Sequence, residues 1–150
     1  MELTASFKTG LRCLVALVEE PGRHSARMLA EGVGASEKYV EQVLMPLRRA
    51  GIVQSRRGPD GGYMLARRAG SISLAEVFSV LQGSFDLCGC PDQACGECVR
   101  PELWRSLEAC WDATLNTVTL EHLASGHHLV VLPGRPTLQV GALFRDGAGI

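Results

Sequence analysis

The sequence predicts a mainly α-helical fold that carries one small β-hairpin and ends in a long helix. Three observations give this prediction. Apolar residues recur at spacings of three and four along much of residues 1–125, as they do on one face of a helix. A single Gly-Pro-Asp-Gly-Gly turn at residues 58–62 separates two short apolar stretches, which is the pattern of a hairpin. The last periodic stretch begins at Pro101, and proline favours the first position of a helix.

Three helices are expected before the hairpin. The first covers residues 3–20. Ser25 and Ser36 then precede two shorter periodic stretches, where each hydroxyl can cap a helix N-terminus. Gly34 and Gly51 follow these stretches, as glycines do at helix C-termini. The apolar side of the third helix is expected to contain Val40, Val43, Leu44 and Leu47.

The remaining elements follow in order. Residues 52–66, "IVQSRRGPDGGYMLA", predict the hairpin, and Ser73 is placed to cap a helix in "SISLAEVFSVLQG". A cysteine-rich stretch at 88–98 precedes the helix that runs from Pro101 to about residue 124. We therefore expect three parts: a region at 1–70, a helix, cysteine loop and long helix at 71–125, and a tail at 126–150 that fits one or two short strands or a loose end.

Charge is unevenly distributed along the chain, whose net charge is −1. Residues 1–70 carry 11 Lys and Arg against 7 Asp and Glu, a net of +4, whereas residues 71–150 carry 4 against 9, a net of −5. Within residues 48–68 six arginines face Asp60 alone. A solvated charged face is one interpretation, but a basic stripe on an acidic protein favours a polyanionic partner.

The composition also bears on location. No apolar run reaches the roughly 20 residues that span a bilayer. The N-terminal "MELTASFKTGLRCLVALVEE" has neither the basic start nor the cleavage site of a signal peptide. We therefore expect a cytoplasmic protein without a membrane partner. In that reducing compartment clustered cysteines bind metal or do redox chemistry more often than they form structural disulfides.

Two short helices joined by a tight turn, and then a glycine-rich hairpin flanked by arginines, form the pattern of a winged helix-turn-helix. A small helical core with an ordinary hairpin is the alternative. In the winged fold one helix enters the major groove, arginines neutralise phosphates, and glycines let the hairpin, or wing, approach DNA closely. The candidate DNA-binding residues are Ser36, Lys38, Tyr39, Glu41 and Gln42 on the third helix, and Arg48, Arg56, Arg57, Gly61 and Gly62 at its end and on the wing.

The sequence resembles the family of winged-helix regulators typified by the iron–sulfur regulator IscR and the nitric-oxide sensor NsrR. The likeness runs from Met1 to about Leu123, and "GASEKYVEQVLMPLRRAGIVQSRRGPDGGYMLAR" is similar to the family's core motif nearly throughout. It implies a dimeric transcription regulator of promoter DNA, with Tyr39 and Glu41 at base-reading positions and Arg57 as a wing arginine. Pro59, Gly61 and Gly62 match the family's wing turn, which adds Pro59 to the candidate DNA-binding residues. Asp60 departs from the family, which often has glycine there.

Four of the six cysteines fall within residues 88–98: Cys88, Cys90, Cys95 and Cys98. Four thiolates in one loop suit Zn²⁺ or an iron–sulfur cluster, and the spacing alone does not separate the two. Cys98 lies just ahead of the expected helix N-terminus, which favours the negative charge of bound thiolates. A thiol–disulfide switch or an unmetallated loop is the alternative.

The resemblance implies an iron–sulfur cluster, either 2Fe-2S or 4Fe-4S, that reports redox state, iron supply or nitric oxide. Cys90, Cys95 and Cys98 match the family's three cysteine ligands. The family's usual fourth ligands are missing, because Pro101 and Lys8 occupy their positions. Cys88 is the natural substitute.

Other functions remain open. A zinc-stabilised or thiol-switch regulator, a protein-interaction module, and a DNA-binding regulator that responds to a small molecule or partner protein all fit the pattern. A thiol oxidoreductase using Cys95 and Cys98 is disfavoured, because no thioredoxin-like βαβ pattern surrounds them, and no enzyme is expected. The last helix carries more apolar face than a monomer needs, which predicts a homodimer with Trp104 or Trp111 at its interface. Cys13 and Cys110 are expected in the core.

Overall fold

The computed structural model describes residues 2–58, 61–83, 101–126, 129–130 and 138–139. In these residues the chain is mainly α-helical and has two small antiparallel hairpins, which confirms the predicted fold class. The elements are α1 (Ala5–Glu19), α2 (Ala26–Val33), α3 (Glu37–Arg49), β1 (Val53–Arg56), β2 (Gly62–Leu65), the 3₁₀ turn η1 (Ala69–Ser71), α4 (Leu74–Leu81), α5 (Pro101–Thr117), α6 (Leu120–Ala124), β3 (Leu129–Val130) and β4 (Leu138–Gln139).

Hydroxyl side chains cap the N-termini of five of the described helices, α1 to α4 and α6. Ser25, Ser36 and Ser73 each accept a hydrogen bond from the backbone N–H three residues later, at 3.1, 3.3 and 3.2 Å, so the three predicted caps are confirmed. Thr4 does the same for α1, accepting from the Phe7 N–H at 3.2 Å. Because Thr4 is the cap, α1 begins at Ala5 and not at residue 3.

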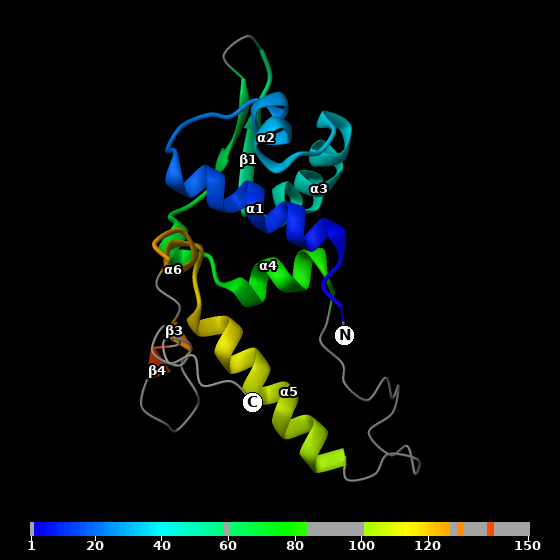
Figure 1. The fold of residues 1–150 in the computed structure, drawn as a ribbon, viewed down its shortest axis with the longest axis vertical. Helices are drawn as coiled ribbons and strands as arrows, with labels where there is room; N and C mark the ends of the chain where they lie inside the picture. Colours follow the sequence, from blue (N-terminus) through cyan, green and yellow to red (C-terminus); the bar gives the residue numbers. More distant parts are fainter. Residues whose placement is uncertain (1, 59–60, 84–100, 127–128, 131–137, 140–150) are drawn as a thin grey trace, which may run out of the picture.

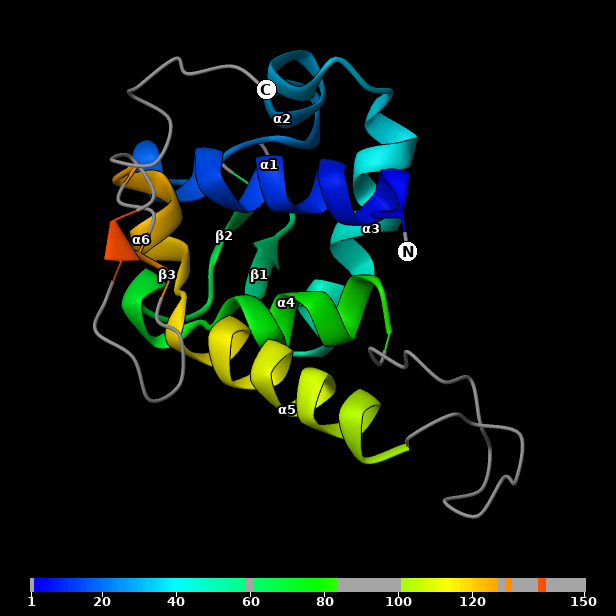
Figure 2. The same cartoon turned by 60° about the horizontal axis from the view of Figure 1, so that its bottom comes forward.

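The helices stack in layers around α1. Figure 1 shows α2, α3 and the β1–β2 hairpin above α1 and α4 below it, and both Figures 1 and 2 show α5 beyond α4. α1 contacts α2, α3, β2, α4 and α6, and α5 contacts α4. No helix in the described ranges is long and apolar enough to cross a membrane.

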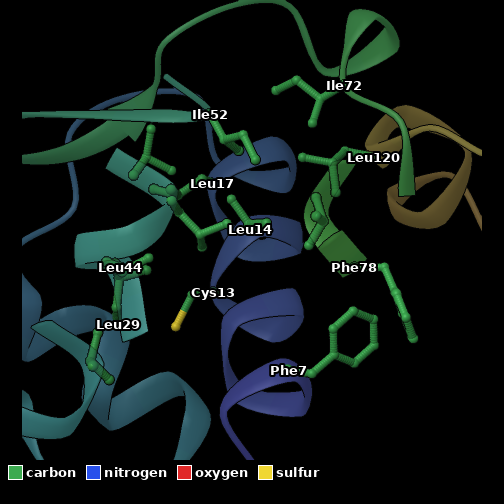
Figure 3. Packing of buried hydrophobic residues seen from close by; sticks show 14 of the residues in the cluster. Phe7, Cys13, Leu14, Leu17, Leu29, Leu44, Ile52, Ile72, Phe78 and Leu120 are labelled. Atoms are coloured by element: carbon green, nitrogen blue, oxygen red, sulfur yellow. The ribbon is translucent and has the colours of Figure 1, made fainter. Parts of the chain in front are cut away.

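One hydrophobic core joins the elements around α1. Leu14, Leu44, Ile52, Ile72 and Leu120 are fully buried in it, and Figure 3 shows them converging from five segments of the chain. Burying one such side chain stabilises a fold by about 1.5–3 kcal/mol. The helices approach closely, since a Cβ on Gly10 of α1 would lie 2.5 Å from Leu81 Cδ1 and 3.0 Å from Val43 Cγ1.

The last helix differs from the prediction. We expected one helix from Pro101 to about residue 124, but α5 ends at Thr117 and α6 begins at Leu120. The break has a non-local cause, because residues 118–120 form backbone hydrogen bonds with residues 72–74 at the start of α4. Val118 O accepts from the Leu74 N–H at 2.7 Å, and the Leu120 N–H donates to Ile72 O at 3.0 Å.

A cap then restarts the helix. The Thr119 hydroxyl accepts from the His122 N–H at 3.4 Å, and His122 Nδ1 accepts from the Thr119 N–H at 3.2 Å. α6 packs against α1 and η1, so the chain turns back onto the core after α5.

Candidate nucleic-acid interface

The third helix presents a polar face to solvent. Val40, Val43, Leu44 and Leu47 are buried, as predicted. Lys38, Glu41 and Gln42 are exposed on the other side, and Tyr39 is half-buried. The Ser36 hydroxyl is occupied as the N-cap, so its first structural role is to fix the start of α3. A helix with an exposed polar N-terminal half and an anchored apolar side has the shape that enters a major groove.

The wing is the β1–β2 hairpin. Its strands pair in register from Val53↔Leu65 to Arg56↔Gly62, and Arg56 and Arg57 are exposed at the turn. Gly58 has φ +114°, in the region that favours glycine, and its carbonyl accepts from the Gly61 N–H at 2.9 Å. Pro59 and Asp60 lie outside the described residues, so their predicted parts in the turn stay predictions.

The base of the wing is held by a residue that the sequence did not single out. His24 pairs with Tyr63 through two backbone hydrogen bonds of 2.9 and 2.8 Å, which adds one residue of a third strand beside β2. The His24 ring Nε2–H donates to Glu20 O at 2.8 Å, at the end of α1. No local pattern signals this contact, because His24 sits in a short connection and its partner is 39 residues away.

The same contact explains why a glycine is needed at position 62. We expected it in the turn, as a glycine that lets the wing approach DNA. In the structure it has φ +145°, and a Cβ there would lie 2.6 Å from His24 O. Gly62 therefore allows the backbone of β2 to meet the connection between α1 and α2, which anchors the wing to the helices.

A polar cleft of about 490 Å³ lies between α3 and the wing. It brings together six of the predicted residues: Glu41, Arg48, Arg56, Arg57, Gly61 and Gly62. Ser36, Lys38, Tyr39 and Gln42 do not line it; they lie on α3 outside the cleft. A carboxylate within a set of arginines can accept from a cytosine amino group while the arginines neutralise phosphates.

Two further cleft residues were not predicted from the sequence. Ser55 accepts a hydrogen bond from Arg48 Nη1 at 3.1 Å. Tyr63 is half-buried, and its pKa is raised by burial and by the Glu41 carboxylate, although the Arg48 charge opposes this. Their signal in the sequence is weak, since serine and tyrosine are ordinary strand residues.

The predicted metal ligands cannot be placed, because Cys88, Cys90, Cys95 and Cys98 lie outside the described residues. Within the described ranges no group of three or more metal-ligating side chains comes together. Cys13 is buried in the core as predicted, and Figure 3 shows its sulfur on the side of Leu29 and Leu44. Burial raises the pKa of the Cys13 thiol to about 11, so it is an unreactive core residue. Cys110 is half-buried and does not belong to the hydrophobic core, so that prediction is wrong.

A second exposed surface lies on α5. Leu103 and Leu107 are 51% and 45% exposed on one side of this helix. Trp111 follows Leu107 by four residues on the same side of the helix, and it stacks edge-to-face on Phe78 of α4, with ring centroids 5.8 Å apart. Trp111 therefore serves the core of its own chain, while the two leucines before it are left exposed.

Comparison with known proteins agrees with this architecture. The family model Rrf2, described as an iron-dependent transcriptional regulator, matches residues 3–126. The HTH-type transcriptional regulator IscR of Klebsiella pneumoniae is 35% identical over 141 residues, covering 90% of this chain and 86% of its own length.

Solved structures give the same result. CymR, the global cysteine regulator of B. subtilis, matches with a TM-score of 0.72 and 30% identity, over 85% of this chain and 99% of CymR. The IscR of T. potens matches with a TM-score of 0.69 and 28% identity, over 84% of this chain and 88% of that one.

Proposed function

Because the chain belongs to the Rrf2 family of transcriptional regulators, we propose that it binds double-stranded promoter DNA as a homodimer and senses through an iron–sulfur cluster. Its family is one of DNA-binding regulators and not of enzymes. The observation that carries the proposal is the cleft between α3 and the wing, where Glu41 and three arginines meet. A DNA-binding regulator works in the compartment that holds the DNA, so we also propose a cytoplasmic location.

DNA binding divides between α3 and the wing. The exposed start of α3 offers Lys38, Glu41 and Gln42 to base edges in the major groove. Arg56 and Arg57 at the wing turn neutralise phosphates beside it. The wing is anchored by the His24–Tyr63 pairing, so its arginines keep a defined place relative to α3.

The proposal for the sensor rests on the chemistry of the cysteine thiols, which can donate sulfur ligands to a metal. Four thiols within eleven residues are the ligand type that iron–sulfur clusters use, so the residues present fit the group. Cys90, Cys95 and Cys98 would hold it, and Cys88 would complete the set. A bound cluster supplies a centre that responds to redox state, iron supply or nitric oxide. Zinc on the same thiolates is the alternative, and it would give a structural site without redox chemistry.

Homodimer formation is supported by α5. Leu103 and Leu107 expose an apolar strip on the helix that directly follows the cysteine loop. A two-fold dimer through this strip would bury it and would place two α3 helices on one DNA duplex. We then expect a palindromic site with half-sites about one helical turn apart.

The DNA assignment is tested with single variants in a binding assay. Arg57→Ala should weaken binding most at low salt and should reduce the salt slope by about 1, because it removes one phosphate ligand. Tyr39→Ala and Glu41→Ala should change which bases are preferred. Arg12→Ala, an exposed arginine on α1 that does not line the cleft, is the matched control. Unchanged affinity and base preference in all three test variants would reject the interface.

A further inference from the structure

Four polar residues inside the cleft form a connected set between α3 and the wing. Glu41 and Arg48 are seven residues apart on α3, which places them two turns apart on one face. Ser55 and Tyr63 are register partners on β1 and β2, so their side chains share one face of the wing. All four line the same cleft.

Direct contact joins the two walls. Arg48 Nη1 donates to Ser55 Oγ at 3.1 Å, which is ordinary hydrogen-bond geometry. Tyr63 lies beside Ser55 and within the electrostatic reach of both Glu41 and Arg48, which act on its hydroxyl with opposite sign. The Arg48 guanidinium is therefore engaged by the wing through Ser55, whereas Arg57 lies at the exposed turn.

The connections of the wing to the rest of the chain allow this one bond to affect the position of the whole wing. Only residues 50–52 connect α3 to β1, so the wing has a short hinge at one end. The His24–Tyr63 pairing fixes β2 on the side of α1 and α2. The Arg48–Ser55 bond is the side-chain link on the α3 side, where the wing faces the base-reading surface.

We propose that Arg48 is a positioning residue that braces the wing against α3 through Ser55, and thereby determines which DNA sequences Glu41 and Arg57 can contact together. The inference rests on the proposed DNA-binding function and assigns one of its residues a different role. A brace sets the separation between the major-groove reader and the wing. DNA sequences differ in groove width and deformability, so a fixed separation selects among them at positions that no side chain touches.

A double-mutant cycle distinguishes a brace from a phosphate ligand. The variants are Arg48→Ala, Ser55→Ala and the two combined, and Ser55→Thr should preserve the bond through its hydroxyl. Arg49→Ala is the matched control, because it removes an adjacent exposed arginine whose contact is Met45 Sδ on its own helix. The measurements are DNA affinity, sequence preference by selection from a random pool, and hydrogen exchange of residues 53–65 without DNA.

The brace predicts that Arg48→Ala and Ser55→Ala each lower affinity for the preferred site by about fivefold, the effect of one hydrogen bond. The double variant should bind no more weakly than the weaker single variant. Both single variants should broaden sequence preference and speed exchange in the wing, whereas Ser55→Thr and Arg49→Ala should not speed it.

The proposal is overturned if Ser55→Ala changes neither exchange nor preference while Arg48→Ala alone weakens binding and reduces the salt slope. That result would make Arg48 a phosphate ligand only. Hydrogen exchange needs no DNA, so it tests the brace even if the wild-type protein binds no specific site. Absence of specific binding would reject the proposed function, and unchanged exchange in both variants would reject the brace.

Discussion

Helices α3 and α5 are both amphipathic, but their own chain covers their apolar sides to different extents. The apolar side of α3 is covered by its own chain, with Val40, Leu44 and Leu47 fully buried, and its outer face is polar. The apolar side of α5 packs Trp111 and Leu115 against α4 and the core, yet Leu103 and Leu107, which precede Trp111 on the same side, are exposed. The polar face of α3 fits a charged partner such as DNA, whereas the uncovered apolar part of α5 fits a second copy of the chain.

In the proposed function, two separate parts of this small protein carry the two tasks. The residues proposed to read DNA have a backbone held by the chain itself, through a cap at Ser36 and the His24–Tyr63 pairing. The surface proposed for assembly is one that a single chain leaves uncovered. Changes in the core of α3 should therefore affect folding, and changes at the exposed leucines of α5 should affect assembly.

The largest effect is expected from Leu103→Glu combined with Leu107→Glu. Two charges on the apolar strip should prevent dimer formation, because each would be buried without a partner. Without the dimer the second half-site is no longer bound by a linked subunit, so affinity for a palindromic site should fall by about 10² or more. Sedimentation and DNA titration measure the two effects.

Ala109→Glu is the control on α5, since Ala109 is exposed on the side away from the leucines. A double variant that remains dimeric would contradict the proposed role of α5, because the exposed strip would then have no part in assembly.

An intermediate effect is expected from Leu44→Ala compared with Leu103→Ala. Leu44 is fully buried, so its truncation should lower the free energy of unfolding by about 2–5 kcal/mol at any protein concentration. Leu103→Ala should act through the dimer, so its effect should grow with protein concentration. Urea unfolding at several protein concentrations measures the change in unfolding free energy for both variants. Equal, concentration-independent effects would show that α5 is as enclosed by its own chain as α3.

The smallest effect concerns Cys13 on α1. Its pKa is raised from 9.0 to about 11 by burial, so the folded state holds the thiol proton more tightly than the unfolded state does. This contribution is present below about pH 9 and is lost as pH rises from 9 through 11. The decline in unfolding free energy over that range should be shallower in Cys13→Ala than in Cys110→Ala. The same decline in both variants would contradict the assignment.

Local signals predicted the DNA-binding half well. Ser25, Ser36 and Ser73 cap helices as expected, and the buried side of α3 contains the four predicted residues. These features depend on spacing within one turn or one helix, which a sequence shows directly.

Interactions between distant segments were not predictable in this way. The break after Thr117 arises from backbone bonds to residues 72–74, and the role of Gly62 arises from the approach of His24. The Arg48–Ser55 bond joins two elements whose relative placement no periodicity encodes. For the cysteines, spacing identified a donor set but not its occupant, because zinc and iron–sulfur centres accept the same thiolates.

The central claim, a DNA-binding regulator whose cysteine loop holds a cluster, is tested most directly by purifying the protein without oxygen and measuring iron, acid-labile sulfide, zinc and the visible spectrum. We predict iron and sulfide with visible absorption, abolished in Cys90→Ser, Cys95→Ser and Cys98→Ser. The absorption should be weakened or labile in Cys88→Ser and unchanged in Cys13→Ser and Cys110→Ser. Protein that carries neither iron nor acid-labile sulfide would contradict the claim, and zinc in its place would identify the loop as a structural site.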